Sequence, residues 1–180
     1  MFFNMKLLLH VCCASCGTIA IEKLSSDFEL TLFWYNPNIY PIAEYKERLV
    51  DFQKLSEIYK LRSIEEKYEN KYWFKIIKGL EEEPEGGERC SLCFKMRLEK
   101  TVELAKENGF DYWGTTLTTG PQKDAQVINS IGVQLAKKYD LQFYSANFKK
   151  EDGFKKSVVL SKKYNFCRQS YCGCIFSQKG

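Results

Sequence analysis

Cysteines are the side chains of this 180-residue sequence best suited to metal or redox chemistry, and most of them lie in short motifs. Cys12 and Cys13 are adjacent, so their Cα atoms lie about 3.8 Å apart, below the roughly 4.4–6.8 Å that an unstrained disulfide prefers. Cys90 and Cys93 have the CxxC spacing that lets two thiolates converge on one ion or cluster. The two pairs together supply four thiolates, enough for a complete metal site.

Two kinds of metal centre suit four thiolates. Structural zinc sites often pair two CxxC knuckles in a small module that folds around the metal. Here one half of the set is a vicinal pair, in a chain long enough to bury a core without metal. This spacing favours an iron–sulfur cluster and leaves zinc as the alternative.

The tail CRQSYCGC contains Cys167, Cys172 and Cys174. A disulfide between Cys172 and Cys174 would close a small, strained ring, and strained disulfides are the labile, oxidising ones. A redox relay is therefore one interpretation, and further metal ligands or a disordered tail are the others. Cys16 lies one turn beyond Cys13, where it is either a further ligand or a packing residue at a helix start.

The single histidine, His10, precedes the vicinal cysteines inside an apolar strand, a position typical of a hydrogen-bonded core residue. With one histidine, a zinc protease or a Ser/His/Asp hydrolase is disfavoured. The sequence also lacks a P-loop and a GxGxxG motif, which argues against common nucleotide-binding enzymes.

Charge and hydropathy indicate where the protein works. The net charge is +4, and residues 149–168 carry seven cations against two acids, either as a solvated helix face or as a phosphate-binding patch. The first residues, MFFNMKLLLHV, have one lysine and a short apolar run, so we expect no secretory signal. No apolar stretch approaches the roughly 18 residues of a membrane span. We therefore expect a cytoplasmic protein, in a reducing compartment that keeps thiols available for metals.

Short apolar runs alternate with segments of helical spacing, which predicts a parallel sheet with helices on both faces, Rossmann-like or HUP-like. No linker or repeat interrupts residues 1–180, so we expect one α/β domain on which the basic helix and cysteine-rich tail, 149–180, pack. The expected strands are 6–11, 30–35, 61–64, 112–117 and 141–145. The expected helices are 17–25, a long helix starting at Pro41, 72–80, 91–107, 122–139 and 153–164.

Ligands of such folds bind beyond the carboxyl ends of the strands. Four loops are expected there: residues 12–16, 36–41, 118–123 and 146–153. Because the first of these loops contains the vicinal cysteines, we expect the chemistry at this edge of the sheet.

Four motifs in order, HVCC, NPNI followed by EYKER, ERCSLC with MRL, and CRQSYCGC, resemble those of the QueH-type epoxyqueuosine reductases. The matches run from residue 6 to residue 174. Members of that family reduce the epoxide of epoxyqueuosine, at the wobble position of certain tRNA anticodons, to give queuosine. The resemblance implies this activity, the last step of queuosine biosynthesis, with tRNA as a partner and an electron donor that the sequence does not identify.

The same resemblance assigns roles to individual cysteines. It implies a 4Fe-4S cluster whose ligands are Cys12, Cys13, Cys90 and Cys93. It also implies a redox-active disulfide between Cys172 and Cys174, and a second adjacent metal ion, iron, for which Cys16 is the candidate ligand. Two positions depart from the family pattern: Ser15 stands where proline is expected, and Phe94 where tyrosine often follows the CxxC motif.

Under this reading the basic stretch 149–168 would hold tRNA phosphates, and the modified base would turn out into a pocket. Candidate pocket residues, by position, are Asn36, Asn38, Tyr45 and Arg48. Two alternatives belong to other classes. A cluster-dependent tRNA thiolation enzyme needs an ATP-binding SGGxDS-like loop where HVCCASC stands, and the other alternative is a zinc-bearing RNA-binding module.

Overall fold

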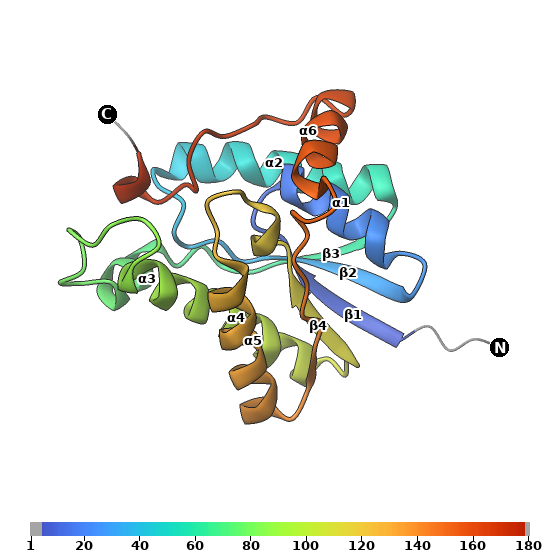
Figure 1. Cartoon of the computed structure of the whole chain (residues 1–180), viewed down its shortest axis with the longest axis horizontal. Coiled ribbons are helices and arrows are strands. Elements are labelled where there is room, and N and C mark those ends of the chain that lie inside the picture. Colours follow the sequence, from blue (N-terminus) through green and yellow to red (C-terminus); the bar gives the residue numbers. More distant parts are fainter. Residues whose placement is uncertain (1–4, 179–180) are drawn as a thin grey trace.

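The computed structural model describes residues 5–178, which form a five-stranded sheet with helices on both faces (Figure 1). The strands are β1 (Met5–His10), β2 (Phe28–Trp34), β3 (Arg62–Glu65), β4 (Tyr112–Thr115) and β5 (Gln142–Phe143). They lie in the order β3-β2-β1-β4-β5, and each neighbouring pair is parallel. The α/β class with a parallel sheet, expected from the alternation of elements, is confirmed.

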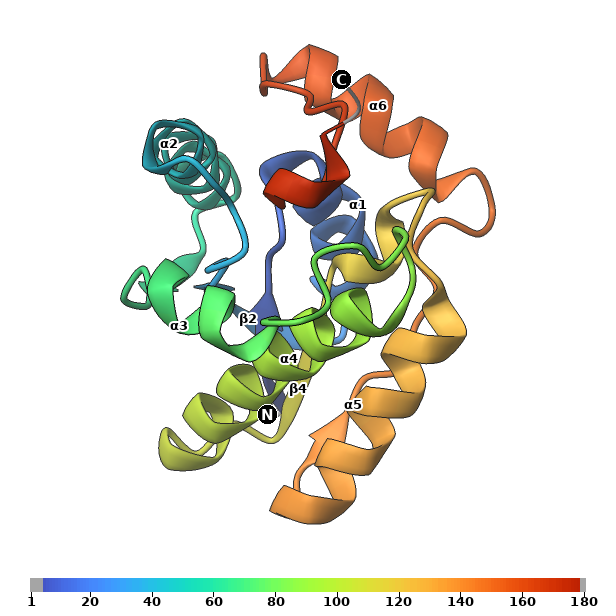
Figure 2. The same ribbon diagram turned by 90° about the vertical axis from the view of Figure 1, so that its left-hand side faces the viewer.

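Helices lie on both faces of the sheet, as Figures 1 and 2 show from two directions. One face carries α1 (Ala14–Leu24), α2 (Ile42–Tyr59) and α6 (Gly153–Lys163). The other carries α3 (Asn70–Ile76), α4 (Glu88–Glu107) and α5 (Ala125–Tyr139). Two short 3₁₀ helices, η1 (Leu117–Thr119) and η2 (Ile175–Ser177), lie near the carboxyl edge. None of the helices in the described part of the chain is long and apolar enough to cross a membrane.

The run Leu7, Leu8 and Leu9 explains why the sheet is buried on both sides. Successive strand residues point to opposite faces, so Leu7 and Leu9 join the core under α1 and α2 while Leu8 joins the core under α4 and α5. All three side chains are fully buried. A continuous apolar run is what a central parallel strand requires.

Helix boundaries follow local chemistry. α4 ends at Asn108 and Gly109, as the sequence predicts, with Gly109 at φ +67°. It begins at Glu88, three residues before the expected start at 91, and this earlier start places both Cys90 and Cys93 within its first two turns. Pro41 precedes α2 as its N-cap residue.

The strand order creates a crevice between β1 and β4. The chain leaving β1 enters α1 on one face, whereas the chain leaving β4 enters η1 and then α5 on the other face. Ligands of open α/β sheets bind at such a switch point. The tail after α6 returns to this edge, where η2 ends the described chain (Figure 2).

Candidate functional site

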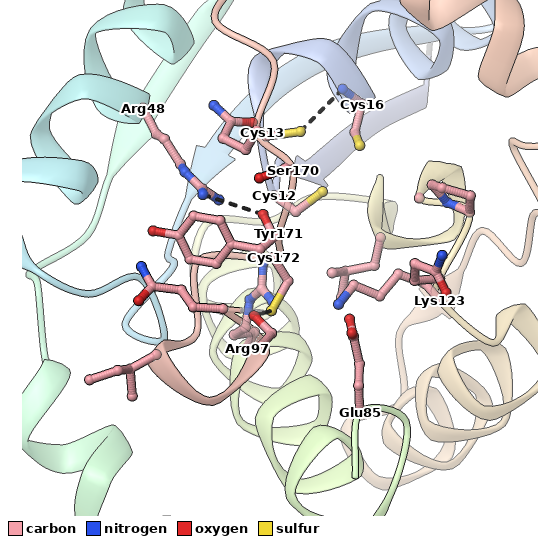
Figure 3. A pocket seen from close by; sticks show the side chains of 18 residues that line it. Cys12, Cys13, Cys16, Arg48, Glu85, Arg97, Lys123, Ser170, Tyr171 and Cys172 are labelled. Atoms are coloured by element: carbon pink, nitrogen blue, oxygen red, sulfur yellow. Dashed lines mark hydrogen bonds between the residues drawn. The ribbon is translucent and has the colours of Figure 1, made fainter. Parts of the chain in front are cut away.

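A cavity of about 770 Å³ lies at the carboxyl edge of the sheet. Its walls come from the loop after β1, the first turn of α1, the loop after η1 and the tail. Figure 3 shows Cys12, Cys13 and Cys16 on one side of this cavity, with Lys123 and Glu85 on another. Cys12, Cys13 and Cys16 thus line a cavity at the edge of the sheet where the loops were expected to meet.

The Sγ atoms of Cys12, Cys13 and Cys16 lie within 4.8 Å of one another. Cys13 is the N-cap residue of α1, and its Sγ accepts a hydrogen bond from the backbone N–H of Cys16 at 3.4 Å. Ser15, where the family pattern has proline, lies in the first turn of α1, so the helix starts here without that proline. A helix N-terminus carries partial positive charge, which favours a thiolate.

The pKa values of the three thiols are shifted in opposite directions. Hydrogen bonds from Cys13 and Cys16 hold the pKa of Cys12 well below its ordinary value. Cys13 and Cys16 are the partners of Cys12 in these hydrogen bonds, and the interaction raises the pKa of Cys13 to about 12 and also raises the pKa of Cys16. Cys12 is therefore the most acidic thiol of the group.

Thr116, immediately after β4, contacts Cys12 twice. Its Oγ1 accepts from the Cys12 backbone N–H at 3.0 Å and donates to the Cys12 Sγ at 3.3 Å. Thr116 is fully buried. This contact joins the two strands that flank the switch point.

Cys90 and Cys93 lie at the start of α4 and line a small adjoining cavity of about 10 Å³, together with Cys172 and Cys174. Cys90 and Cys93 are not part of the close group of three around Cys12. The four cysteines expected to bind one cluster thus fall into two neighbouring groups. Arg97 and Cys172 line both cavities, which places the two groups side by side.

Arg97 is the buried cation between the two groups of cysteines. It is 3% exposed, and its Nη2 donates to Asn36 Oδ1 at 2.5 Å. Asn36 in turn donates from Nδ2 to the carbonyl of Val11 at 2.9 Å. Within residues 5–178, the Nε of Arg97 has no hydrogen-bond acceptor. Because a buried N–H is normally paired, this donor is available to a hydrogen-bond acceptor bound in the cavity.

Cys172 and Cys174 are both free thiols here. Cys172 Sγ lies 3.0 Å from the Ser177 hydroxyl. A hydrogen bond from the Cys174 thiol, aided by the charge of Lys123 and by Ser177, holds the pKa of Cys172 well below its ordinary value. The interaction with Cys172 raises the pKa of Cys174. This pairing of an activated and a protonated thiol suits thiol–disulfide exchange.

Lys123, in the loop after η1, lines both cavities. Burial alone lowers the pKa of this ammonium group, but the facing thiolate of Cys172 and the thiols of Cys93 and Cys90 raise it overall. Its Nζ also lies 5.6 Å from the centroid of the Phe94 ring. Phe94 thus supplies an aromatic face to a cation without the hydroxyl that tyrosine would add.

His10 is a satisfied core residue, as its position in the strand predicts. It is fully buried, with Nδ1 2.9 Å from Thr115 Oγ1 and Nε2 3.1 Å from the carbonyl of Tyr35. Burial, together with the charge of Arg97, lowers its pKa to about 3. The imidazole is therefore neutral, donating from Nε2 to the carbonyl and accepting at Nδ1.

Only some of the candidate pocket residues line a cavity. Arg48 lines the large cavity, and Asn38 lines the small one. Asn36 lines neither cavity, but its Oδ1 accepts a hydrogen bond from Arg97, which lines both. Tyr45 also lines neither cavity: its ring packs against Trp34, with centroids 5.9 Å apart, because the apolar face of α2 carries it into the core. For Asn36 and Tyr45 the positional prediction is wrong.

Sequence reasoning did not assign Thr116, Arg97, Lys123 or Tyr171 to this site, and all but Thr116 line the large cavity. One signal was available for Arg97: it follows Cys93 by four residues, one turn of the same helix. The others come from loops, whose side-chain directions have no period to follow. Cys167, by contrast, is exposed, and its backbone N–H donates to Asp51 Oδ2 at 2.7 Å.

Two solved structures with a similar fold are of proteins whose names refer to tRNA modification. The chain resembles the U34-tRNA thiolase NcsA from Methanococcus maripaludis, a structure with its 4Fe-4S cluster, with a TM-score of 0.62 and 13% identity over 98% of this chain and 62% of that one. It also resembles a predicted subunit of tRNA methyltransferase from Methanocaldococcus jannaschii, with a TM-score of 0.56 and 17% identity over 87% of this chain and 74% of that one. At these identities the likeness shows the fold.

Sequence comparison is more specific. The family model described as epoxyqueuosine reductase QueH matches residues 7–180. Proteins named epoxyqueuosine reductase QueH match nearly the whole chain: that of Staphylococcus epidermidis is 40% identical over 96% of this chain and 76% of its own length. The Streptococcus pyogenes protein is 38% identical, over 97% and 71%, and the Thermotoga maritima protein 34%, over 95% and 89%. The chain therefore belongs to the QueH family of epoxyqueuosine reductases.

Proposed function

We propose that this protein reduces the epoxide of epoxyqueuosine, at the wobble position of tRNA anticodons, to the alkene of queuosine. The main support for the proposal is the position of Cys172, which lines both of the cysteine-lined cavities at the switch point of the sheet. Cys172 therefore lies between the large cavity, which could hold the substrate, and the cysteines at the start of α4. Membership of the family supplies the substrate.

Cys12, Cys13, Cys90 and Cys93 would hold a 4Fe-4S cluster, and Cys16 would be a ligand of a second, adjacent iron ion. The donor set supports this assignment, since cysteine thiolates are the usual ligands of such clusters. The orphaned Nε of Arg97 supports it too, because a buried cation beside the thiols would offset the negative charge of a thiolate-bound group. A bound cluster supplies one-electron transfer and Lewis acidity near the substrate oxygen.

The tail cysteines provide a balanced source of reducing equivalents. Reduction of the epoxide breaks both C–O bonds, forms the C=C bond and releases water, which takes up two electrons and two protons. Oxidation of the Cys172 and Cys174 thiols to a disulfide releases two electrons and two protons. An external thiol or low-potential electron carrier then restores the two thiols.

Other side chains would bind and orient the substrate. Lys123 and Arg97 place positive charge beside the thiols, where negative charge develops as the epoxide opens. The seven cations of residues 149–168 would hold tRNA phosphates, so binding should weaken with salt. We also propose that the protein works in the cytoplasm, as a single α/β domain that includes residues 149–180.

The two rival functions lack comparable support. A tRNA thiolation enzyme needs an ATP-binding loop after β1, where this chain has CCASC. A zinc-bearing RNA-binding module is compatible with the close group of Cys12, Cys13 and Cys16, whose spacing suits a single ion. Metal content separates the cluster from zinc.

The decisive experiment gives the anaerobically purified, iron-loaded protein a reductant and tRNA carrying epoxyqueuosine. Nucleoside mass spectrometry should detect the loss of one oxygen atom from the modified base. A Cys93→Ser variant should lose iron and labile sulfide, whereas the exposed Cys167→Ser variant should retain both. No conversion by cluster-replete protein would overturn the proposed function, and stoichiometric zinc in place of iron would overturn the cluster.

A further inference from the structure

Tyr171 is the one aromatic side chain among the 18 residues that line the large cavity. The other lining residues are cysteines, charged or polar groups and a few small or aliphatic side chains. Tyr171 directly precedes Cys172, the residue whose thiol is proposed to supply electrons, and both residues line this cavity.

A buried cation fixes one side of this ring. The guanidinium carbon of Arg48 lies 5.0 Å from the ring centroid, and Arg48 Nη2 donates to the Tyr171 carbonyl at 3.3 Å. Arg48 is 3% exposed and is anchored by Glu44, whose Oε1 lies 2.6 Å from Arg48 Nε. Figure 3 shows Arg48 reaching from α2 toward the ring and backbone of Tyr171. This cation–π contact holds the ring in place.

The ring has no aromatic partner within residues 5–178, although many other rings of the chain pair with one another. It is partly exposed and borders the cavity. A half-buried ring, held by a cation and open to a cavity, has a face available to a flat ligand.

The backbone around the ring is also held before any ligand arrives. Asn38 Nδ2 donates to the Cys172 carbonyl at 3.4 Å, and the Tyr40 backbone N–H donates to the Gly173 carbonyl at 2.9 Å. Gly173 adopts φ +100°, a conformation that suits glycine. A platform ordered in advance avoids the entropy cost of ordering it during binding.

We propose that Tyr171 is the platform on which the modified base of the substrate nucleotide stacks, with Arg48 fixing the ring. The inference rests on the proposed function, and it adds the residue that positions the base. Bases turned out of RNA stack on aromatic side chains, and such stacking tolerates modification because every base has a π face. With the base on Tyr171, the group attached to it lies beside Cys172.

The test is a ring series at this position: Tyr171→Phe, Tyr171→Trp and Tyr171→Leu. Removing an aromatic platform costs about 1–3 kcal/mol per base, so Tyr171→Leu should raise the KM for epoxyqueuosine tRNA by roughly 5- to 150-fold. Tyr171→Phe and Tyr171→Trp keep a π face and should stay within about threefold of the original KM. An unchanged KM in Tyr171→Leu, or an equal loss in Tyr171→Phe, would overturn the proposal.

A displaced tail would imitate this result, so iron content and the alkylation rate of Cys172 are measured in each variant. Both should be unchanged in Tyr171→Leu. If Cys172 alkylation does change there, Tyr171→Trp decides: a restored KM supports stacking, and an unrestored KM overturns it. Filter binding, which measures the affinity for epoxyqueuosine tRNA, separates this inference from the proposed function. If the unaltered protein shows no turnover, the proposed function is wrong, but the affinities of the three variants still test the stacking role of Tyr171.

Discussion

The hydroxyl of Thr116 makes two hydrogen bonds to Cys12, one to its backbone N–H at 3.0 Å and one to its Sγ at 3.3 Å. The contact spans 104 residues of sequence and joins the ends of the two adjacent strands, β1 and β4. A single side chain therefore holds the first cysteine of the site in position, and it adds to the hydrogen bonds from Cys13 and Cys16 that lower the pKa of this thiol.

Replacing Thr116 with valine keeps the shape and removes both hydrogen bonds. The Cys12 backbone N–H would lose its acceptor, and an unsatisfied buried donor costs about 1–3 kcal/mol. We expect this decrease in the free energy of unfolding of the metal-free protein, measured by urea denaturation. In the control, Thr101→Val, the lost hydroxyl bonds a carbonyl of its own helix at 2.8 Å, so the cost should be smaller. Equal costs would contradict the role assigned to Thr116.

Lys123 should control the reactivity of Cys172. Its charge contributes to the low pKa of that thiol, so Lys123→Met should raise the pKa. An opposite charge nearby shifts a pKa by about one unit or more, so the midpoint of the pH profile of Cys172 alkylation should move upward by about one unit. Peptide mass spectrometry of metal-free protein over a series of pH values gives this profile. Lys137→Met, at an exposed position of α5, is the control, and equal shifts in both variants would refute the pairing.

Gly173→Ala should displace the tail. A Cβ at this position would lie 2.8 Å from Ile39 Cγ1 and 2.9 Å from Arg48 Nη1, in addition to the strain of φ +100°. Backbone strain alone costs about 1–2 kcal/mol. Gly79→Ala is the matched control, since Gly79 has φ +88° but no atom within 4 Å of such a Cβ. We expect Gly173→Ala to lose more stability than Gly79→Ala in urea denaturation, and to lose turnover as well. A turnover rate unaffected by Gly173→Ala would show that the tail position does not matter.

His10 should make the protein less stable in mild acid. Its pKa is about 3 in the folded protein against 6.5 when unperturbed, so between these values the unfolded chain binds more protons. The stability contributed by neutral His10 is thus complete above pH 6.5 and is lost as pH falls toward 3.

The measurement compares unfolding of metal-free protein at pH 7 and pH 5. Over this interval His10 should account for about 2 kcal/mol of the loss. His10→Gln can still donate to the Tyr35 carbonyl and accept from Thr115 but does not titrate, so this part of the pH dependence should disappear. The same pH dependence in the variant would show that His10 is not the titrating group.

The central strands could be predicted from the sequence because parallel strands buried on both faces are continuous apolar runs. The run Leu7 to Leu9 and the stop at Asn108 and Gly109 each have a local cause. β5, in contrast, was expected over residues 141–145 and spans Gln142–Phe143. An edge strand has one neighbour to pair with, and its length depends on that neighbour rather than on its own sequence.

The site was predictable to the extent that its residues lie in motifs. The sequence identified the cysteines, and the loop that carries Cys12 and Cys13 lies at the expected edge. The spacing of Cys16, one turn beyond Cys13, indicated that it could lie near the pair. The distance of Cys93 from them could not be predicted, because it depends on how α1 and α4 approach the crevice. Thr116 and Lys123 act through contacts over long sequence distances, which a local pattern does not contain.

Cys172 borders both cavities and is one half of the thiol pair proposed to supply the electrons. Such a pair alternates between a dithiol form, which reacts with the substrate, and a disulfide form, which reacts with the external reductant. Turnover should therefore follow ping-pong kinetics, in which a saturating amount of either partner inhibits the other. The RNA must leave before the next pair of electrons enters.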